Sequence, residues 1–482
     1  MLDLRPVIHL IGLLGLTMGL LMLLPAAVDW QAGQDNWQSF VGASFLITIV
    51  CATAALTTRN ALEAGLGRRQ SFLLTASVWA VLPALGALPL IMGAPNATLT
   101  HAYFEAMSGM TTTGTTVFTG LDDLPPGVLL WRSILQWLGG LGIIIVALVF
   151  LPALRVGGMQ HFQAEAFDTM GKVLPRVYDI SAGLLQVYFG LTLAAIVAYM
   201  AFGMSGFDAI NHAMTTIATG GFSTTDDSFA AFTGPLEYVS VLFMVLAGLP
   251  FIRFIQLVGG SWAAVWSDVQ VRAFLRWIAY AVGAIILYRL ATTDASFPDV
   301  VRGTLFNVVT LFTGTGYGSE DVAGWGDFPL LIVILVGFIG ACTASTGCAL
   351  KVFRYLVLFE AIRAQMQRLR RPHEVVALRL GGKRLEPDVI SSVIVMFTVF
   401  VASFMALAVA LSLTGLEMRT AITAAWTAIC NIGPVFGPEV GATGAVDGFP
   451  TAAKWLMILG MYLGRLEVLT VLVLLLPRFW RG

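Results

Sequence analysis

The chain is a succession of long apolar stretches separated by short polar intervals. The first stretch, residues 7–28, contains no acidic or basic side chain apart from His9. It is long enough to cross a bilayer, which needs roughly 20 helical residues. A second stretch covers residues 40–56. Eight more bring the number of predicted spanning helices to ten, at 72–92, 128–151, 180–202, 238–257, 273–291, 330–350, 389–413 and 453–476.

A shorter pattern recurs four times, each time between two of the predicted spans. A brief apolar helix is expected to run into a Thr/Gly-rich extended stretch, as in residues 306–318, which read FNVVTLFTGTGYG. In each copy an anchor glycine follows ten residues after the first residue of the motif, and the anchors are Gly114, Gly220, Gly316 and Gly433. The residues before them are Thr113, Thr219, Thr315 and Ile432. Matching offsets in four places indicate an internal repeat.

The short helices cannot span a bilayer, so the repeat predicts four re-entrant segments. Irregular backbone at membrane depth is tolerated only where it is buried in protein or lines a wet cavity. Four pseudo-symmetric segments are expected to surround one axis and to turn main-chain carbonyl groups towards it, which can replace the hydration shell of K⁺. The predicted filter consists of Thr112, Thr113, Gly114 and Thr115; Thr219, Gly220 and Gly221; Thr313, Gly314, Thr315, Gly316 and Tyr317; and Asn431, Ile432, Gly433 and Pro434.

These patterns predict an all-α polytopic membrane protein in which four helix–pore loop–helix units surround one central pore. Two extra transmembrane helices, residues 1–70, precede unit 1 at 71–160, unit 2 at 161–260, unit 3 at 261–385 and unit 4 at 386–482. Composition agrees, because 57% of the 482 residues are hydrophobic and only 11% are charged, which excludes a soluble domain of this size. Re-entrant loops that bind no ion and serve helix packing are the structural alternative.

The chain offers little for covalent chemistry, and we expect that it is not an enzyme. A membrane-embedded enzyme needs clustered carboxylates, His ligands or a nucleophile beside a base, and only five His occur. The cysteines lie in apolar surroundings without a CxxC or Cys/His pairing, so we expect small buried hydrophobes at Cys51, Cys342, Cys348 and Cys430. We expect no organic cofactor and no nucleic-acid partner.

Basic residues concentrate in the loops on one side of the predicted spans, which the positive-inside rule assigns to the cytoplasm, together with both termini. They are Arg59, Arg68, Arg69, Arg155, Lys172, Arg176, Arg272, Arg354, Arg363, Arg368, Arg370, Arg371, Arg379, Lys383, Arg384, Arg478 and Arg481. The opposite loops carry acids after each anchor glycine, namely Asp122, Asp123, Asp226, Asp227, Glu320, Asp321 and Glu439. These acids are either ordinary solvated loop residues or a negative vestibule that concentrates cations.

The repeat resembles that of the TrkH/KtrB/HKT cation transporters, and the resemblance covers nearly the whole chain. It rests on the four single glycines, on CNIGP around Gly433, on LQWLGGLGIIIV at 135–146 and on LGRLEVLTVL at 463–472. The two helices before unit 1 and the length are similar to the TrkH branch. The resemblance implies K⁺ uptake across the bacterial inner membrane, a homodimer, and a cytosolic ring of TrkA-like nucleotide-binding subunits. It also implies K⁺ preference, because Gly114 is not Ser.

One predicted span contains GACTASTGCALK, residues 340–351, whose small residues do not favour a continuous helix. The resemblance implies an intramembrane gating loop here, beneath the filter, and a throttling role for Arg465 of the last span. The predicted gate consists of Gly340, Thr343, Ser345, Thr346, Gly347, Lys351 and Arg465. Small-residue helix packing is the alternative for the loop, cytoplasmic-end anchoring for Lys351 and Arg354, and an internal pair with Glu467 for Arg465. Cys348, Ala349 and Leu350 depart from the Gly-rich loop of the family, which bears on the mobility of this loop.

Five further polar residues carry expectations of their own, and so does the coupling of transport. We expect Asn211, Asn307 and Asn431 to hydrogen-bond the filter backbone and His212 to be a packed neutral side chain. Arg253 is expected to snorkel from a helix end. The alternative function is a symporter that couples K⁺ to H⁺ or Na⁺, which needs an ionisable or coupling-ion site near mid-membrane.

Regulation by a nucleotide has to come from another subunit, because the chain contains no Walker A motif and no GxGxxG before a Rossmann-like unit. The basic loop at 354–384 is the expected contact for that subunit. Anionic membrane lipids are the alternative partners for the same charges.

Overall fold

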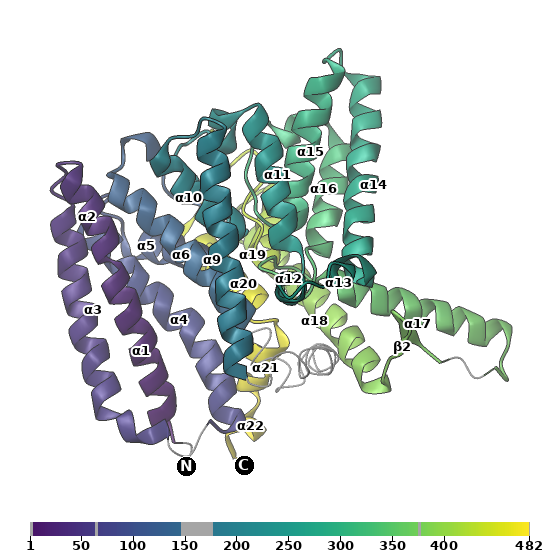
Figure 1. Cartoon of the computed structure of the whole chain (residues 1–482), viewed down its shortest axis with the longest axis horizontal. Coiled ribbons are helices and arrows are strands. Elements are labelled where there is room, and N and C mark those ends of the chain that lie inside the picture. The colour runs from purple at the N-terminus through teal and green to yellow at the C-terminus, as the bar shows by residue number, and fades with distance from the viewer. Residues whose placement is uncertain (1–2, 63–65, 146–176, 375–376, 482) are drawn as a thin grey trace.

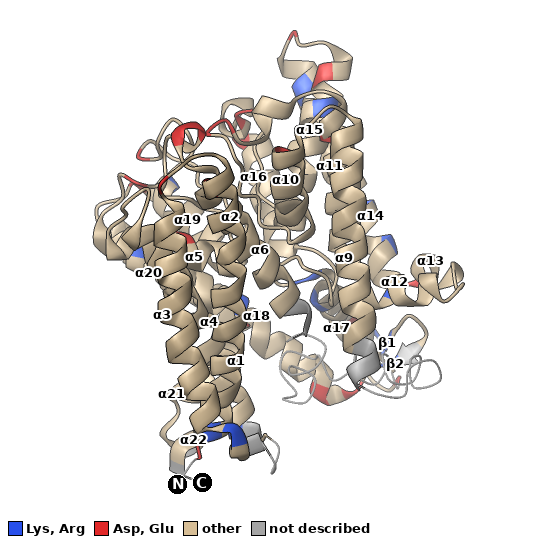
Figure 2. Cartoon of the chain, turned by 60° about the vertical axis from the view of Figure 1, so that its left-hand side comes forward, with Lys and Arg blue, Asp and Glu red and all other residues tan. Residues whose placement is uncertain are grey.

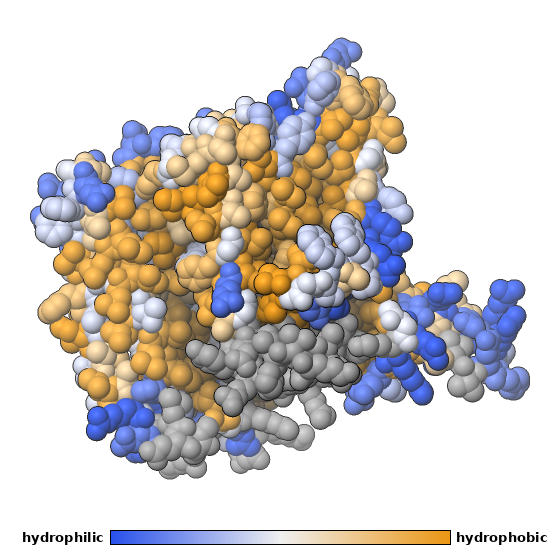
Figure 3. Space-filling model, in the orientation of Figure 1, coloured by the Kyte–Doolittle hydropathy of each residue, from blue (hydrophilic) through white to orange (hydrophobic). Residues whose placement is uncertain are grey.

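The computed structural model describes residues 3–62, 66–145, 177–374 and 377–481, and these residues form a bundle of helices (Figure 1). Six of the described helices are long and apolar enough to cross a membrane, and eight spans result if each of two bent helix pairs counts as one. An apolar surface covers the middle of the face shown in Figure 3, with hydrophilic side chains along its upper and lower margins. The predicted class, an all-α polytopic membrane protein, is confirmed.

The two leading helices form a hairpin at one edge of the bundle (Figure 1). α1 (Arg5–Leu21) continues into α2 (Leu23–Gln31) as one span, and α3 (Trp37–Thr57) returns beside it. A Cβ atom on Gly12, Gly15 or Gly19 of α1 would collide with α3, so the two backbones approach closely, as small residues allow in membrane helices. The short helix η1 (Arg59–Leu62) follows, and α4 (Arg68–Met92) leads into the first unit.

Unit 1 contains α5 (Leu99–Met110), η2 (Leu121–Asp123) and α6 (Pro126–Ile145). Asp29 of α2 fixes the N-terminal hairpin to this unit. Its buried carboxylate accepts hydrogen bonds from the Gly127 backbone N–H at 2.5 Å and from Asn36 Nδ2 at 2.8 Å. Gly127 lies in the first turn of α6, so the carboxylate satisfies a free helix-terminal donor and lies at the positive end of the helix dipole.

Unit 2 contains α9 (Val177–Ala201), α10 (Gly206–Ile217), η4 (Ser228–Phe232), α11 (Pro235–Gly248) and α12 (Phe251–Val258). The continuous span predicted at 238–257 is wrong, because α11 and α12 meet at 95°. Pro250 lacks the N–H for a helical hydrogen bond and favours an extended Leu249, observed at φ −83° and ψ 157°. Arg253, after the break, pairs with Asp268 Oδ2 at 2.8 Å, and the snorkelling role expected for it stays a prediction.

Unit 3 contains α13 (Ala263–Ser267), α14 (Val269–Thr292), α15 (Phe297–Thr313), η5 (Val322–Trp325) and α16 (Asp327–Ile339). The span predicted at 330–350 ends early, because residues 340–351 form no helix. α17 (Val352–Arg370) then projects sideways from the bundle (Figure 1). A small antiparallel hairpin of β1 (Arg379–Leu380) and β2 (Lys383–Arg384), with Arg379 opposite Arg384, precedes unit 4.

Unit 4 contains α18 (Pro387–Ser412), α19 (Met418–Cys430), α20 (Thr451–Arg465), α21 (Leu469–Leu475) and α22 (Pro477–Arg481). α20 and α21 meet at 108°, so the continuous span predicted at 453–476 is wrong as well. Buried apolar side chains form two main clusters. One lies mainly in units 2 and 3, the other in the N-terminal helices with units 1 and 4, and α10 and α19 contribute to both.

The two ends of the bundle differ in what they carry. Both chain termini lie at one end (Figure 1), and acidic loop residues gather at the other (Figure 2). The loops that follow the short helices are therefore on the side opposite the termini. Arg155, Lys172 and Arg176 are among the basic residues predicted to lie on the cytoplasmic side. They lie outside the described residues.

Candidate ion pore

The four short helices end in the same backbone conformation. A left-handed residue follows each helix or its last turn, with φ of 52° at Thr112, 51° at Thr219, 80° at Gly314 and 53° at Asn431. Two residues later each segment has a glycine at positive φ, which L side chains rarely adopt. These glycines are Gly114 at 89°, Gly221 at 74°, Gly316 at 84° and Gly433 at 111°.

This comparison corrects the predicted register of unit 2 by one residue. The backbone N–H of Gly220 donates to the carbonyl five residues back, Thr215, at 2.8 Å, as that of Thr113 does to Ser108. Gly220 is therefore equivalent to Thr113, and Gly221 to Gly114. In the sequence motif, Thr219 aligns with Thr113 and Thr315, which precede the other anchor glycines. Two glycines follow Thr219, so the local pattern does not decide which of them is the anchor.

The four glycines meet the neighbouring segments in a closed ring. A Cβ atom added to Gly114 would collide with the carbonyl oxygen of Gly220, one on Gly221 with that of Thr315, and one on Gly316 with that of Ile432. The ring closes where a Cβ on Gly433 would lie 2.9 Å from the Thr113 carbonyl oxygen. The four segments, far apart in sequence, therefore converge on one constriction in which a side chain at these positions has no room.

Hydrogen bonds between units brace this ring. The Thr115 hydroxyl of unit 1 donates to the Gly433 carbonyl of unit 4 at 2.6 Å. Gln136 of α6 donates from Nε2 to the Gly220 carbonyl at 2.7 Å and accepts from the Phe222 N–H at 3.0 Å. The carbonyl groups of Gly220 and Gly433 thus already accept hydrogen bonds. Gln136 was not predicted, although a polar residue within an apolar span is a signal that could have pointed to it.

The three asparagines have different hydrogen-bond partners, and none of these partners is the backbone of the predicted filter. Asn307 Oδ1 accepts a hydrogen bond from the Ser319 N–H, just beyond the ring, at 3.2 Å. Asn211 donates within its own helix to Phe207, and Asn431 donates to the Thr113 hydroxyl at 2.9 Å, a side chain and not the filter backbone. The prediction that these asparagines hydrogen-bond the filter backbone is therefore wrong for all three.

His212 is buried, as predicted, with its ring edge-on to Phe232 at a centroid distance of 4.8 Å. Its two ring nitrogens have partners, the Asp208 carbonyl at 2.9 Å and the Ser223 hydroxyl at 3.1 Å. The side chain is thus a packed and satisfied part of unit 2.

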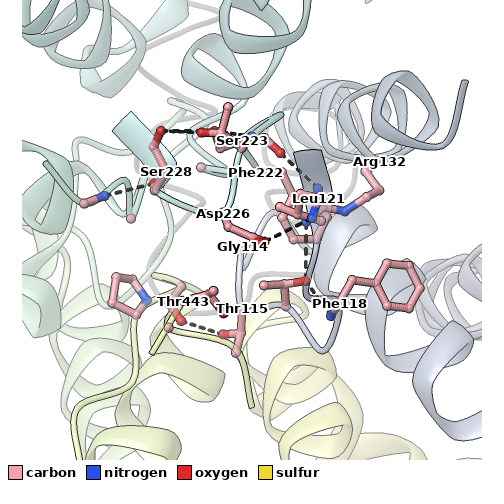
Figure 4. A pocket seen from close by; sticks show the side chains of 18 residues that line it. Gly114, Thr115, Phe118, Leu121, Arg132, Phe222, Ser223, Asp226, Ser228 and Thr443 are labelled. Carbon is pink, nitrogen blue, oxygen red and sulfur yellow. Dashed lines mark hydrogen bonds between the residues drawn. The ribbon is translucent and has the colours of Figure 1, made fainter. Parts of the chain in front are cut away.

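A cavity of about 170 Å³ lies directly outside the ring, lined by Gly114, Gly221, Gly316 and Gly433 among other residues (Figure 4). Asp226 and Arg132 are the charged residues among its lining. The Asp226 carboxylate accepts hydrogen bonds from the N–H groups of Gly120 at 2.8 Å and Leu121 at 3.1 Å, so it fastens unit 2 to unit 1. Glu320 likewise pairs with Arg289 at 2.8 Å. Several of the outer acids are therefore structural fasteners.

Residues 340–351 lie on the other side of the ring, where the sequence predicted a loop. Gly340, Ala344, Ala349 and Lys351 all have positive φ, which no helix accommodates. The loop fits into the break between α11 and α12, where the Cys342 N–H donates to the Gly248 carbonyl at 3.0 Å and the Ala344 carbonyl accepts from Phe251 at 2.9 Å. A Cβ on Gly347 would lie 2.8 Å from the Thr313 carbonyl, so the loop touches the inner end of the predicted filter.

The remaining predicted gate residues surround this contact. Thr343 donates its N–H to Gln270 Oε1 at 3.2 Å, the Ser345 hydroxyl donates to Cys342 at 2.6 Å, and the Thr346 hydroxyl donates to Ala247 at 3.1 Å. All three side chains are buried. The loop is thus held by hydrogen bonds from two flanking elements.

Buried cations cluster beneath the loop. Arg465 donates to the Gly139 carbonyl at 2.8 Å and to the Cys348 sulfur, which joins the last unit to both unit 1 and the loop. Glu467 pairs with Arg354 at 2.6 Å, so the alternative of an Arg465–Glu467 pair is wrong. Lys351 is 6% exposed and Arg354 1%, so neither is a cytoplasmic-end anchor.

Comparison with known proteins agrees with this architecture. A TrkH family model, described as a cation transport protein, matches residues 38–481. The Trk system potassium uptake protein TrkI of Halomonas elongata is 38% identical, over 99% of this chain and 97% of its own length. TrkH of Escherichia coli K12 is 34% identical over 99% of both chains. The crystal structure of the potassium transporter TrkH from Vibrio parahaemolyticus superposes with a TM-score of 0.91 at 32% identity and covers both chains entirely.

The fold and the ring define an α-helical multi-pass membrane protein of the transporter class. The chain belongs to the TrkH family.

Proposed function

We propose that this chain mediates K⁺ uptake through a pore whose selectivity filter is the ring of four re-entrant segments. The closed ring of glycines, each against the carbonyl of the next segment, carries the proposal. Carbonyl rings of this kind can replace the hydration of K⁺. The relatives are Trk system potassium uptake proteins, which supports K⁺ as the transported ion. The chain acts as a transporter and not as an enzyme.

The proposed filter consists of Thr112–Gly114, Gly220–Gly221 with Thr219, Thr313–Gly316 and Asn431–Gly433, and the loop at 340–351 with Arg465 forms the gate below it. The contact between Gly347 and Thr313 supports this assignment, because movement of the loop changes what lies directly under the filter. We further propose that the chain works as a homodimer in the bacterial inner membrane, with both termini in the cytoplasm and a nucleotide-binding TrkA-like ring against it.

A flux assay in proteoliposomes tests the filter. Gly316→Ala places a methyl group against the Ile432 carbonyl and should abolish or strongly reduce K⁺ selectivity over Na⁺. Gly318→Ala, two residues away, is the matched control, because a Cβ there meets no atom within 4 Å. Equal selectivity in the wild type and in Gly316→Ala would contradict the filter assignment.

The reversal potential distinguishes a channel from a symporter coupled to H⁺ or Na⁺. A channel follows the K⁺ gradient alone, whereas a coupled transporter also responds to an imposed pH or Na⁺ gradient. We expect the reversal potential to follow K⁺ alone.

A further inference from the structure

We propose that the ion pair of Glu105 and Arg132 positions the outer end of the filter and neutralises a cation that would otherwise repel K⁺ in the vestibule. The inference rests on the proposed function. Glu105 belongs to α5, the short helix of unit 1, and Arg132 to α6. Glu105 Oε1 lies 2.8 Å from Arg132 Nε, and the side chains are 0% and 1% exposed.

The pair binds the extended segments of two different units. The Glu105 carboxylate accepts hydrogen bonds from the Thr116 hydroxyl at 2.8 Å and from the Val117 N–H at 3.0 Å, both in unit 1. Arg132 Nη1 donates to the Ser223 carbonyl of unit 2 at 3.0 Å. Thr116 and Ser223 each lie two residues beyond the ring glycine of their unit. One ion pair therefore fixes the spacing of two neighbouring filter segments.

Other units have an uncharged counterpart of this brace. Nine residues before the ring glycine, unit 1 has Glu105, unit 2 has His212 and unit 3 has Asn307. His212 contacts the Ser223 hydroxyl at 3.1 Å, and Asn307 accepts from the Ser319 N–H at 3.2 Å. The same polar connection from short helix to outer segment thus recurs with neutral groups. A neutral side chain suffices for the mechanical role, so the charge in unit 1 calls for a separate reason.

Arg132 supplies that reason, because it lines the vestibule through which ions would approach (Figure 4). Its guanidinium lies 4.2 Å from the centroid of the Phe222 ring, next to the outer filter segment of unit 2. A cation here, partly screened from water, raises the energy of a nearby K⁺. The adjacent Glu105 carboxylate cancels most of that field while Arg132 keeps its hydrogen bond to Ser223.

The test is the K⁺ concentration for half-maximal uptake in proteoliposomes, measured beside K⁺/Na⁺ selectivity. Glu105→Gln keeps the shape of the side chain but leaves the cation, so half-saturation should shift to roughly tenfold higher K⁺. Arg132→Gln should not raise it, and the double variant Glu105→Gln/Arg132→Gln should return to within about twofold of the wild type. A purely mechanical pair predicts instead that Arg132→Gln raises half-saturation as much as Glu105→Gln and that the double variant is no better. That result would overturn the charge role.

Asn307→Ala is the matched control, since it removes the neutral brace of unit 3. It should lower selectivity without raising half-saturation. Glu105→Asp keeps the negative charge but shortens the side chain, so it should also lower selectivity without raising half-saturation. This variant keeps the proposal testable if Glu105→Gln does not fold. The proposal would be contradicted if Glu105→Asp raised the half-saturating K⁺ concentration by the same factor as it lowered K⁺/Na⁺ selectivity. If the wild type carries no K⁺, the proposed function fails. If Gly316→Ala loses selectivity while Glu105→Gln matches Asn307→Ala, only this inference fails.

Discussion

The hydroxyl of Tyr317 donates a hydrogen bond to the carbonyl oxygen of His212 at 3.2 Å, and thereby fastens the extended segment of unit 3 to the short helix of unit 2. The same hydroxyl lies 2.5 Å from the Thr215 hydroxyl. Tyr317 directly follows the ring glycine Gly316 and is 1% exposed. The backbone at the ring is thus held from behind by a side chain that belongs to the filter segment itself.

Tyr317→Phe should therefore widen the range of ions admitted. A buried neutral hydrogen bond contributes about 1 kcal/mol, which corresponds to a loss of roughly fivefold in K⁺ selectivity over Na⁺. Competitive flux of K⁺ and Na⁺ measures this loss. Tyr462→Phe is the control, because Tyr462 also donates to a carbonyl, that of Ala76 at 3.0 Å, on a different helix pair. A similar loss of selectivity in both variants would contradict a specific role for Tyr317.

Gln136→Leu should also reduce selectivity, because it removes both hydrogen bonds that hold Gly220 and Phe222. A buried N–H left without an acceptor costs about 1–3 kcal/mol. Gln270→Leu is the contrast, since Gln270 holds the gate loop through the Thr343 N–H at 3.2 Å. We expect Gln270→Leu to change the uptake rate and leave the K⁺/Na⁺ ratio unaltered, whereas Gln136→Leu changes the ratio. If Gln136→Leu changed only the uptake rate and Gln270→Leu changed the K⁺/Na⁺ ratio, the roles assigned to these two amides would be contradicted.

Glu467→Gln should destabilise the protein, because it removes the carboxylate that pairs with the buried Arg354 at 2.6 Å. Loss of one member of a buried ion pair typically costs about 3–5 kcal/mol. The thermal melting of the detergent-solubilised protein measures the effect. Glu360→Gln serves as the control, because Glu360 approaches Arg363 only at 3.9 Å and that arginine is 78% exposed. Equal melting temperatures for Glu467→Gln and the wild type would contradict the structural importance of the pair.

The loop after the filter of unit 4 should contribute a pH-dependent part of stability. The Thr420 hydroxyl and, less strongly, the Glu417 N–H donate to the Glu439 carboxylate and lower its pKa below the ordinary value of 4.5. A lowered pKa in the folded state stabilises the protein above pH 4.5, and this contribution is lost as the pH falls through the lower folded pKa. Glu439→Gln should therefore lower the melting temperature at neutral pH, with the difference from the wild type vanishing in acid. A difference independent of pH would contradict this linkage.

The sequence predicted the four short helices and the segments after them because both depend on local signals. Apolar runs set the helices, and the Thr/Gly pattern marked the positions where positive φ is required, such as Gly316. The breaks between helices were harder to predict. Pro250 is a local signal for the break between α11 and α12, although it stands within a long apolar run. The bend between α20 and α21 contains Glu467, which has a φ of 52° and pairs with Arg354, more than a hundred residues earlier in the chain.

Contacts between units could not be predicted from the repeat. The predicted register at Gly220 was wrong by one residue because the local sequence pattern fits either of the two adjacent glycines. The hydrogen bond from the Gly220 N–H to the Thr215 carbonyl identifies the correct register. The Glu105–Arg132 pair joins residues that approach only when α5 packs against α6. Polar side chains within apolar spans, Arg132 and Gln136 four residues apart, were the available signal for a buried function.

The four units are covalently linked, and this gives them a freedom that four identical subunits lack. In a symmetric tetramer every substitution appears in all four quadrants, so a glutamate in one would mean four carboxylates crowded about the axis. Here glutamate, histidine, asparagine and alanine (Ala424) share the corresponding place, one per quadrant. Evolution could thus adjust the electric field at the mouth in steps of a single charge.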